Sequence, residues 1–324
     1  MSKDIDRVRG ALYGVAVGDA LGAPLEFMDA ESIQRQHGTV RDMIGGGWLN
    51  VKPGEVTDDT QMTLCVAHGI VSAPHDPVVS VGVNFLRWVD SRPKDIGSTC
   101  ASAISRARYR ASSNYWNTSY IWRNDLIPTE AEWRAAALDV HNGSGGRSAG
   151  NGSLMRTVYA GLYYDKATDA CIKAEHISEM THHDELATEA CIAYSVAVFS
   201  ILFDMSDDER RIVMRDVIET ASDHRYDFSL LSSDSFTPNP SGYVVDSFSA
   251  ALHCICTTSI FEEAIVKAVN LGGDADTIGA ITGGLAGALY GYEAIPQRWT
   301  KHLSKELCAD MEWLTSEAMK DKQL

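Results

Sequence analysis

Apolar residues recur at helical intervals along most of the chain. The clearest run follows the i, i+3, i+4, i+7, i+8 pattern of a helix that faces a core, at Phe261, Ala264, Ile265, Ala268 and Val269. Residues 185–203 are apolar nearly all round and residues 60–72 are similar, which predicts helices buried on several sides. Alternation with a period of two is rare, and only residues 40–44 could form a short extended piece. The pattern predicts a protein that is mostly or wholly α-helical.

Two segments near the ends of the chain carry a glycine at every fourth position. One stripe is Gly10, Gly14, Gly18 and Gly22, and the other is Gly279, Gly283, Gly287 and Gly291. A glycine inside a helix costs about 0.5–1 kcal/mol relative to alanine, so a stripe of them indicates that another backbone approaches closely. We expect two helices packed against close neighbours, with each other as the natural partners. Flexible loops and a membrane pair are the alternatives; intervening apolar residues disfavour loops, and Arg7, Arg9 and Asp19 disfavour a membrane pair.

The segment at about 105–145 departs from this helical pattern and has the character of an insertion. It mixes Asn, Ser and Arg with aromatic residues, namely Tyr109, Tyr115, Trp116, Tyr120, Trp122 and Trp133. These aromatics form either ordinary packing or a recognition surface, and packing is favoured because aromatic side chains dominate cores as well as interfaces. No low-complexity linker divides the chain, so we expect one domain over residues 1–324.

Composition narrows the classes of function. The 324 residues are 45% hydrophobic, enough for a sizeable core, and carry a net charge of −16. An acidic surface repels phosphate backbones and anionic lipids, so we expect neither nucleic acid nor a membrane as partner. The N-terminus lacks the apolar core of a signal peptide, and the seven cysteines lack zinc-ligand spacing. We therefore expect a cytoplasmic protein with free, buried thiols.

Two short acidic clusters, far apart in the sequence, carry the candidate chemistry. They are Thr57-Asp58-Asp59 and Asp274-Ala275-Asp276-Thr277, and each stands where a loop opens a predicted helix. Such residues can be simple caps, because their oxygens accept hydrogen bonds from the free N–H groups of a helix start. The second cluster, however, follows Gly272-Gly273, a turn that lets the backbone approach something closely. If the clusters converge, their oxygens suit two hard cations such as Mg²⁺ or Mn²⁺.

Further runs accompany these clusters along the chain. They are Gly18-Asp19-Ala20-Leu21-Gly22-Ala23-Pro24-Leu25-Glu26-Phe27, Asp95-Ile96-Gly97, Gly150-Asn151-Gly152-Ser153-Leu154-Met155-Arg156, Thr181-His182 and Ser241-Gly242-Tyr243-Val244-Val245-Asp246. With them, the chain from about residue 8 to residue 292 resembles the ADP-ribosylglycohydrolase family, which includes the dinitrogenase reductase-activating glycohydrolase. The resemblance implies an all-α orthogonal multi-helix bundle around a binuclear centre of two Mg²⁺ or Mn²⁺ ions. It also implies hydrolytic release of ADP-ribose from a modified target.

The resemblance assigns expected roles to individual residues. The implied metal ligands are Thr57, Asp58, Asp59, Asp274, Asp276 and Thr277. Glu26 matches the acidic residue of the first loop and Asp95 an acidic residue near the substrate ribose, so both are candidate catalytic acids or bases. The segment that lines the ADP-ribose cleft is matched by Asn151, Gly152, Ser153 and Met155, with His182 and Tyr243 near it. From the residues alone, Glu26 could instead be an exposed loop acid and Asp95 a helix cap.

Asp19, inside the first glycine-striped segment, needs a partner if it is buried. Two roles are open for its carboxylate: a hydrogen bond to a helix start, which we prefer, and support of the metal ligands.

Glycosidic cleavage develops positive charge at the anomeric carbon, so the site needs nearby carboxylates and a placed water. We expect a hydrolase that removes ADP-ribose from a mono-ADP-ribosylated protein side chain, with arginine-linked ADP-ribose as first choice. The alternative is an immunity or binding protein that neutralises a cognate ADP-ribosyltransferase toxin by occlusion, which the aromatic insertion motivates. A purely structural protein on this scaffold would be expected to lack ligand carboxylates, and all four are present.

Overall fold

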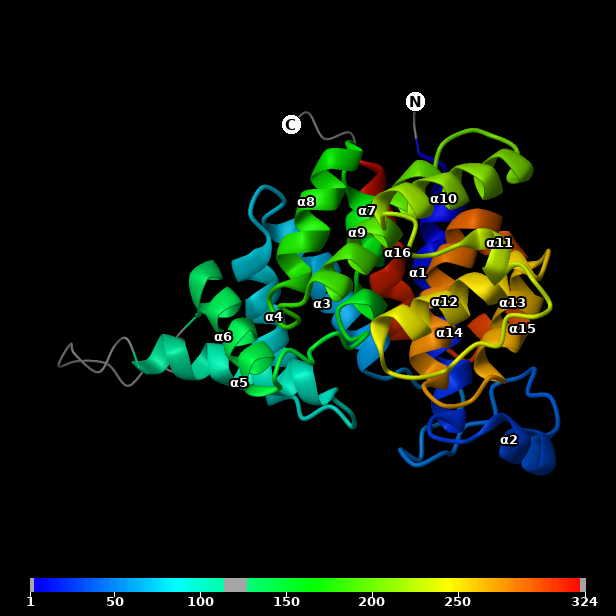
Figure 1. Ribbon diagram of the computed structural model, residues 1–324, viewed down its shortest axis with the longest axis horizontal. Helices are drawn as coiled ribbons and strands as arrows, with labels where there is room; N and C mark the ends of the chain where they lie inside the picture. Colours follow the sequence, from blue (N-terminus) through cyan, green and yellow to red (C-terminus); the bar gives the residue numbers. More distant parts are fainter. Residues whose placement is uncertain (1–2, 114–126, 321–324) are drawn as a thin grey trace.

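The computed structural model describes residues 3–113 and 127–320, and every regular element in those ranges is a helix (Figure 1). The α-helices are α1 (Ile5–Gly22), α2 (Ala30–His37), α3 (Asp58–Ser72), α4 (Val78–Asp90), α5 (Ser98–Ser113), α6 (Glu130–Gly143), α7 (Val158–Tyr163), α8 (Ala167–Ser178), α9 (Glu185–Ser200), α10 (Asp207–Ala221), α11 (Phe228–Leu231), α12 (Val244–Cys256), α13 (Phe261–Val269), α14 (Ala275–Tyr290), α15 (Gln297–Thr300) and α16 (Lys305–Met319). Short 3₁₀ turns are η1 (Ala23–Leu25), η2 (Leu154–Arg156) and η3 (Tyr292–Ala294). Residues 40–44 form no strand, and β-pairing in the described ranges is limited to isolated bridges. The all-α prediction is confirmed.

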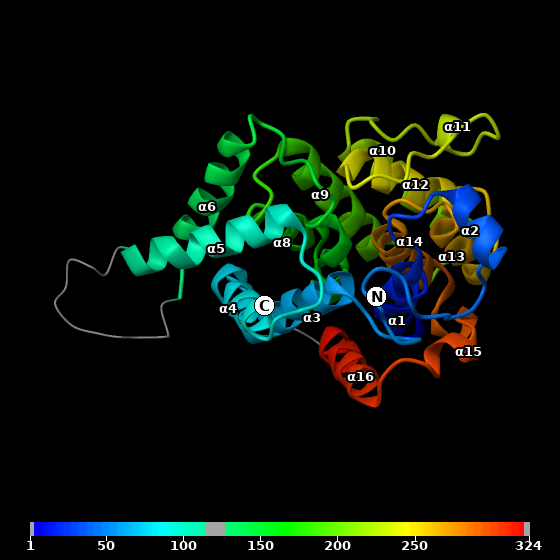
Figure 2. The same ribbon diagram turned by 90° about the horizontal axis from the view of Figure 1, so that it is seen from below.

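Helices α1 and α14 lie side by side at the centre of the fold and run antiparallel in backbone contact (Figure 2). A methyl group placed on Gly14 would lie 2.0 Å from the carbonyl oxygen of Gly283, and one on Gly18 would lie 2.0 Å from that of Gly279. The predicted pairing of the two glycine stripes is confirmed. At the end of the seam, Gly22 meets the backbone of Ala275. The last turn of α1 therefore lies beside the first turn of α14, which carries the second acidic cluster.

The other predicted helices are found with small changes of boundary. Residues 60–72 belong to α3, and the pattern at 261–269 is α13. The predicted helix at 185–203 ends earlier, at Ser200. Residues 201–203 do not continue the helix. The carbonyl of Leu202 instead accepts the N–H of Asp4 at 2.8 Å, and the chain then enters the capping box at Ser206 that opens α10.

The predicted insertion corresponds to α5, α6 and the chain between them, and both helices project to one side of the molecule (Figures 1 and 2). Trp133 on α6 is fully buried, with its ring 6.4 Å from that of Phe85 on α4. Tyr109 on α5 is 71% exposed. The prediction that the aromatic residues of this segment pack in the interior is thus confirmed for Trp133. Four others lie outside the described residues: Tyr115, Trp116, Tyr120 and Trp122.

Two expectations from composition can be compared with the structure. All seven cysteines lie in the described part of the chain and are free thiols, three of them buried. Among the described helices, none combines the length and the apolar character that crossing a bilayer requires.

Candidate active site and metal centre

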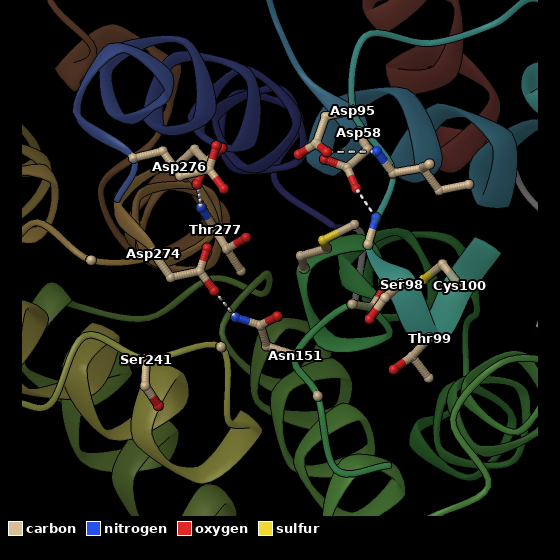
Figure 3. A pocket seen from close by; sticks show the side chains of 18 of the residues that line it. Asp58, Asp95, Ser98, Thr99, Cys100, Asn151, Ser241, Asp274, Asp276 and Thr277 are labelled. Carbon is tan, nitrogen blue, oxygen red and sulfur yellow. Dashed lines mark hydrogen bonds between the residues drawn. The ribbon is translucent and has the colours of Figure 1, made fainter. Parts of the chain in front are cut away.

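The two acidic clusters face one cavity of about 550 Å³. Figure 3 shows Asp274, Asp276 and Thr277 on one side of it and Asp58 and Asp95 on the other. Asp59 lies behind the cavity wall, where burial and then the charges of Asp19, Asp58 and Asp274 raise its pKa well above the ordinary value. Carboxylates from α3 and from the start of α14 therefore lie close enough to raise one another's pKa. The two acidic clusters converge, which was the condition for a metal site in the sequence analysis.

Capping explains few of the contacts of these carboxylates; in the first turn of α14, Oδ1 of Asp276 accepts the N–H of Thr277 at 2.9 Å. Neither Thr57 nor Asp274, the residues at the helix starts, makes a side-chain cap hydrogen bond. The start of α3 is satisfied by Asp19 of α1, whose carboxylate accepts the N–H groups of Thr57 at 3.0 Å and Thr60 at 3.1 Å. It also accepts the hydroxyl of Thr57 at 2.8 Å. The preferred role of Asp19 is thereby confirmed, and the carboxylates of α3 are left available for other partners.

The Gly272-Gly273 turn brings Glu26 to the second cluster. The N–H of Phe27 donates to the carbonyl of Gly273 at 2.7 Å, and the N–H of Gly273 donates to that of Met28 at 2.7 Å. Both glycines have positive φ, and a methyl group on Gly272 would lie 2.2 Å from the carbonyl oxygen of Met28. The close approach predicted for this turn is confirmed.

This turn gathers three carboxylates at one point. One oxygen each from Glu26, Asp274 and Asp276 lie within 4.8 Å of one another. Burial raises the pKa of Glu26 to about 7, against the lowering effect of a hydrogen bond from Trp48 and with further raising by Asp95 and Asp274. Glu26 is only 8% exposed, so it is not an exposed loop acid.

The residues present fit a divalent cation. Oδ1 of Asp59 is buried and makes no hydrogen bond within the described part of the chain. Burial and then the neighbouring carboxylates Asp59, Asp274 and Glu26 raise the pKa of Asp276 well above its ordinary value. An unpaired buried acceptor and crowded like charges are costly, and a hard cation relieves both.

Asp95 lies beside Asp58 of the first cluster, on the same side of the cavity (Figure 3). Its Oδ1 accepts the N–H of Ile96 at 2.7 Å, and Oδ2 of Asp58 accepts the N–H of Gly97 at 3.3 Å. Burial, then the charge of Asp95, raises the pKa of Asp58 to about 7. Among the described residues, the carboxylate of Asp95 accepts no hydrogen bond from the start of α5, and it lines the cavity.

The opposite part of the cavity is built from the glycine-rich run that precedes η2. Nδ2 of Asn151 donates to Oδ2 of Asp274 at 2.6 Å and to Oγ of Ser247 at 2.8 Å. The N–H of Asn151 donates to the carbonyl of Gly242 at 3.1 Å. A methyl group on Gly152 would lie 3.1 Å from Cε1 of His182. Because Gly150 and Gly152 have no side chains, the ring of His182 has room in the cavity wall.

A buried chain of hydrogen bonds positions the ring of His182. Arg156, fully buried, donates through Nη2 to Oγ1 of Thr181 at 2.7 Å, and that oxygen lies 2.8 Å from Nδ1 of His182. An arginine only donates, so the hydroxyl proton of Thr181 is free to be donated to Nδ1; in that arrangement the ring proton of His182 is on Nε2. Burial, helped by the charge of Arg156, lowers the pKa of His182 to about 3. The ring is therefore neutral near pH 7, and its Nε2 lies beside Gly150.

Comparison with known families identifies the family of this chain. The family described as ADP-ribosylglycohydrolase matches residues 1–323. The chain belongs to this family. The ADP-ribosyl-[dinitrogen reductase] glycohydrolase of Rhodospirillum rubrum is 32% identical over 93% of this chain and 92% of its own. The ADP-ribosylarginine hydrolase Tri1 of Serratia proteamaculans is 29% identical over 94% and 77%, respectively.

Structural comparison supports the same conclusion. A solved structure described as an ADP-ribosylglycohydrolase-related protein complex superposes with a TM-score of 0.73 at 30% identity, covering 97% of this chain and 99% of that one. The protein is therefore an ADP-ribosylglycohydrolase in fold and in general hydrolytic activity.

Within this ADP-ribosylglycohydrolase, some residues expected at the cleft lie elsewhere. Ser153 is 2% exposed and makes its hydrogen bonds with Ser178 and Cys191, behind the wall. The side chain of Tyr243 is 43% exposed and does not line the cavity, although its backbone forms a bridge with Gly150. Ser153 thus differs from the expectation because its hydroxyl turns toward Ser178 and Cys191, whereas Tyr243, expected near the cleft, adjoins it through Gly150.

Other lining residues were missed from the sequence. Trp48, Thr99 and Cys100 line the cavity, as does Phe27. Phe27 ends a run that was singled out, so its position beside Glu26 was a usable signal. Trp48 follows three consecutive glycines, which mark a tight loop but not where it packs.

Proposed function

We propose that this protein hydrolyses the bond between ADP-ribose and an arginine side chain of a mono-ADP-ribosylated protein, using two bound Mg²⁺ or Mn²⁺ ions. The observation that supports bound cations most directly is at Asp59. Its buried Oδ1 makes no hydrogen bond in the described structure and lies among carboxylates from both clusters. The arginine linkage is supported by relatives at 29–32% identity, one of which is called an ADP-ribosylarginine hydrolase.

The proposed metal ligands are Thr57, Asp58, Asp59, Asp274, Asp276 and Thr277. Bound divalent cations would supply Lewis-acid polarisation and a template for orienting ribose hydroxyls and water. The chain itself fixes the ligands: Asp19 holds Thr57, and Asn151 holds Asp274. The bond from Asn151 restricts the carboxylate of Asp274, which lines the cavity, and the bond to Asp19 fixes the hydroxyl of Thr57.

Glu26 and Asp95 are the proposed acid and base. In hydrolysis the water oxygen bonds to the anomeric carbon, the carbon–nitrogen bond breaks, and the guanidine nitrogen gains a proton. One carboxylate accepts a proton from the attacking water. The leaving nitrogen receives a proton either from the second carboxyl group or, in a later step, from the first. The pKa of about 7 for Glu26 suits proton transfer in either direction near neutral pH.

The substrate's ADP-ribose part is proposed to bind along Asn151, Gly152 and Met155, with Nε2–H of His182 as a donor to an acceptor oxygen. Ser153 and Tyr243 would support this wall from behind and from the rim.

The test compares Asp58→Asn with the wild type on an arginine-linked mono-ADP-ribosylated protein, with and without EDTA followed by Mg²⁺. Loss of one ligand is expected to lower kcat/KM by about 10³-fold or more, because metal stabilisation of the transition state amounts to several kcal/mol. Asp208→Asn, on the exposed first turn of α10, is the matched control and should keep full activity. Activity that survives both EDTA and Asp58→Asn would falsify the proposal.

The occlusion alternative is separated by the same variant. Protection of a target against an ADP-ribosyltransferase should disappear with Asp58→Asn if hydrolysis is the activity. Protection that persists in the inactive variant would favour occlusion.

A further inference from the structure

Two large aromatic side chains stand at the mouth of the cavity. Phe27 is 72% exposed and Trp48 is 52% exposed, with ring centroids 5.4 Å apart, and both line the cavity. Single exposed aromatics are ordinary on a protein surface, but these two adjoin each other and a buried carboxylate. We call Phe27 and Trp48 the aromatic pair.

The backbone at Phe27 is held in a conformation that its side chain disfavours. Its φ is 64°, in the left-handed region, where a bulky non-glycine residue is unusual. Hydrogen bonds to the Gly272-Gly273 turn fix this segment, so the conformation is imposed by the surrounding fold. The positive φ of Phe27 and the exposure of its ring to water each reduce the stability of the folded protein. Strained residues of this kind are concentrated at functional sites.

Trp48 is positioned with equal firmness. Its Nε1 donates to Oε2 of Glu26 at 2.5 Å. The loop before it presses on η1, since a methyl group on Gly47 would lie 2.8 Å from Cα of Pro24. The hydrogen bond uses one oxygen of Glu26, and the ring face of Trp48 stays partly exposed beside that carboxylate.

We propose that the aromatic pair receives the guanidinium of the arginine leaving group and thereby sets the linkage preference of the enzyme. This inference rests on the proposed function. Aromatic faces attract a planar cation, and arginine is the side chain that most often stacks on them. Glu26, bonded to Trp48, and Asp95, which lines the same cavity, place two carboxyl groups near this position. A neutral serine or ester leaving group would gain nothing from this arrangement.

The position of the pair agrees with this role. The glycine loop at 150–152 and His182 line one part of the cavity, and Glu26 with Asp274 and Asp276 forms the acidic centre. A substrate with ADP-ribose on the glycine loop and its anomeric carbon at the acidic centre can extend its arginine past Glu26. The aromatic pair is the surface that it then meets.

The experiment measures two quantities for Phe27→Leu and Trp48→Leu. One is kcat/KM for an arginine-linked ADP-ribosylated peptide, and the other is the inhibition constant of free ADP-ribose, which has no guanidinium. The first should fall about 5- to 30-fold, as for loss of a partly desolvated cation–π contact, while the second stays within about twofold. Tyr109→Leu, another exposed aromatic outside the cavity, should change neither.

Trp48→Phe separates stacking from the hydrogen bond to Glu26. It keeps an aromatic face and deletes Nε1–H, so KM should stay within about twofold of the wild type while kcat falls. A KM as high as that of Trp48→Leu would show that the face is not what binds the arginine.

Equal weakening of both measured quantities would overturn the inference, because the pair would then hold the ADP-ribose part. Unchanged kcat/KM in Phe27→Leu and Trp48→Leu would overturn it as well. A wild-type enzyme that leaves the arginine-linked peptide intact would instead overturn the proposed function and, with it, this inference.

Discussion

The same two helices contain the most closely packed and the most electrostatically crowded regions described here. Along the seam of α1 and α14, backbones touch through glycines and almost every residue is buried. At one end of the seam, Asp19 of α1 and Asp276 of α14 lie with Asp59 of α3 among like charges. The seam is held by direct packing of backbone on backbone, whereas the acidic end crowds like charges and leaves Oδ1 of Asp59 without a hydrogen bond in the described structure.

The difference shows how the fold can keep repelling carboxylates together. Each charge is carried on a helix end or an adjoining loop that the seam holds in place. Relaxing the repulsion by moving α14 would separate Gly279 and Gly283 from Gly18 and Gly14, and so lose close packing. Stability stored in the seam therefore preorganises the site for a cation.

The largest expected effect is at the seam. Gly14→Ala would place a methyl group 2.0 Å from the carbonyl oxygen of Gly283, in contact with backbone that cannot rotate away. We expect a loss of about 3 kcal/mol or more in the free energy of unfolding, measured by urea denaturation. Gly143→Ala is the matched control, since a methyl group there meets nothing within 4 Å. It should be neutral or stabilise by up to about 1 kcal/mol. Equal effects of the two substitutions would contradict the close packing.

The opposite sign is expected at the acidic end. Asp59→Asn removes a buried carboxyl group whose ionised form is disfavoured by burial and by the neighbouring carboxylates, and whose Oδ1 has no hydrogen bond in the described structure. The amide also adds a hydrogen-bond donor among carboxylates. Metal-free protein should gain about 1–3 kcal/mol in stability, by the same urea measurement. The variant should also lose the rise in Tm that Mg²⁺ gives the wild type. A destabilised metal-free variant would mean that the carboxylate is satisfied without a cation.

The smallest effect concerns pH. The pKa values of Glu26 and Asp58 are each raised to about 7, so the folded protein holds protons that the unfolded chain releases near pH 4. The free energy of unfolding of metal-free protein should therefore fall as pH rises from about 4 to about 7 through these groups. His182, whose pKa is lowered, acts in the opposite sense below pH 6.5.

Comparing Tm with and without Mg²⁺ isolates the carboxylates, because His182 is present in both conditions. Protons compete with the cation, so the gain from Mg²⁺ should be a few degrees larger at pH 8 than at pH 5.5. A gain that is independent of pH would argue against cation binding by these groups.

Features that repeat or stand adjacent in the chain could be predicted from the sequence. Helical periodicity predicted α3, α9 and α13, and the spacing of Gly14 and Gly283 with their neighbours predicted the seam. The order of short motifs indicated the family and placed Glu26, Asp58 and Asp276 in one site. These features are local because they depend on hydrophobic period, backbone freedom and residue type.

Only the tertiary structure decided which groups meet across distant segments. Asp19 capping α3, Trp48 holding Glu26, and Arg156 acting through Thr181 on His182 all join residues from different elements. Ser153 turned away from the cavity for the same reason. A hydrogen bond exists only within about 3 Å and at a suitable angle, and packing of remote helices sets both quantities. The sequence determined which chemistry was available, and the packing of α1, α3 and α14 determined where it converges.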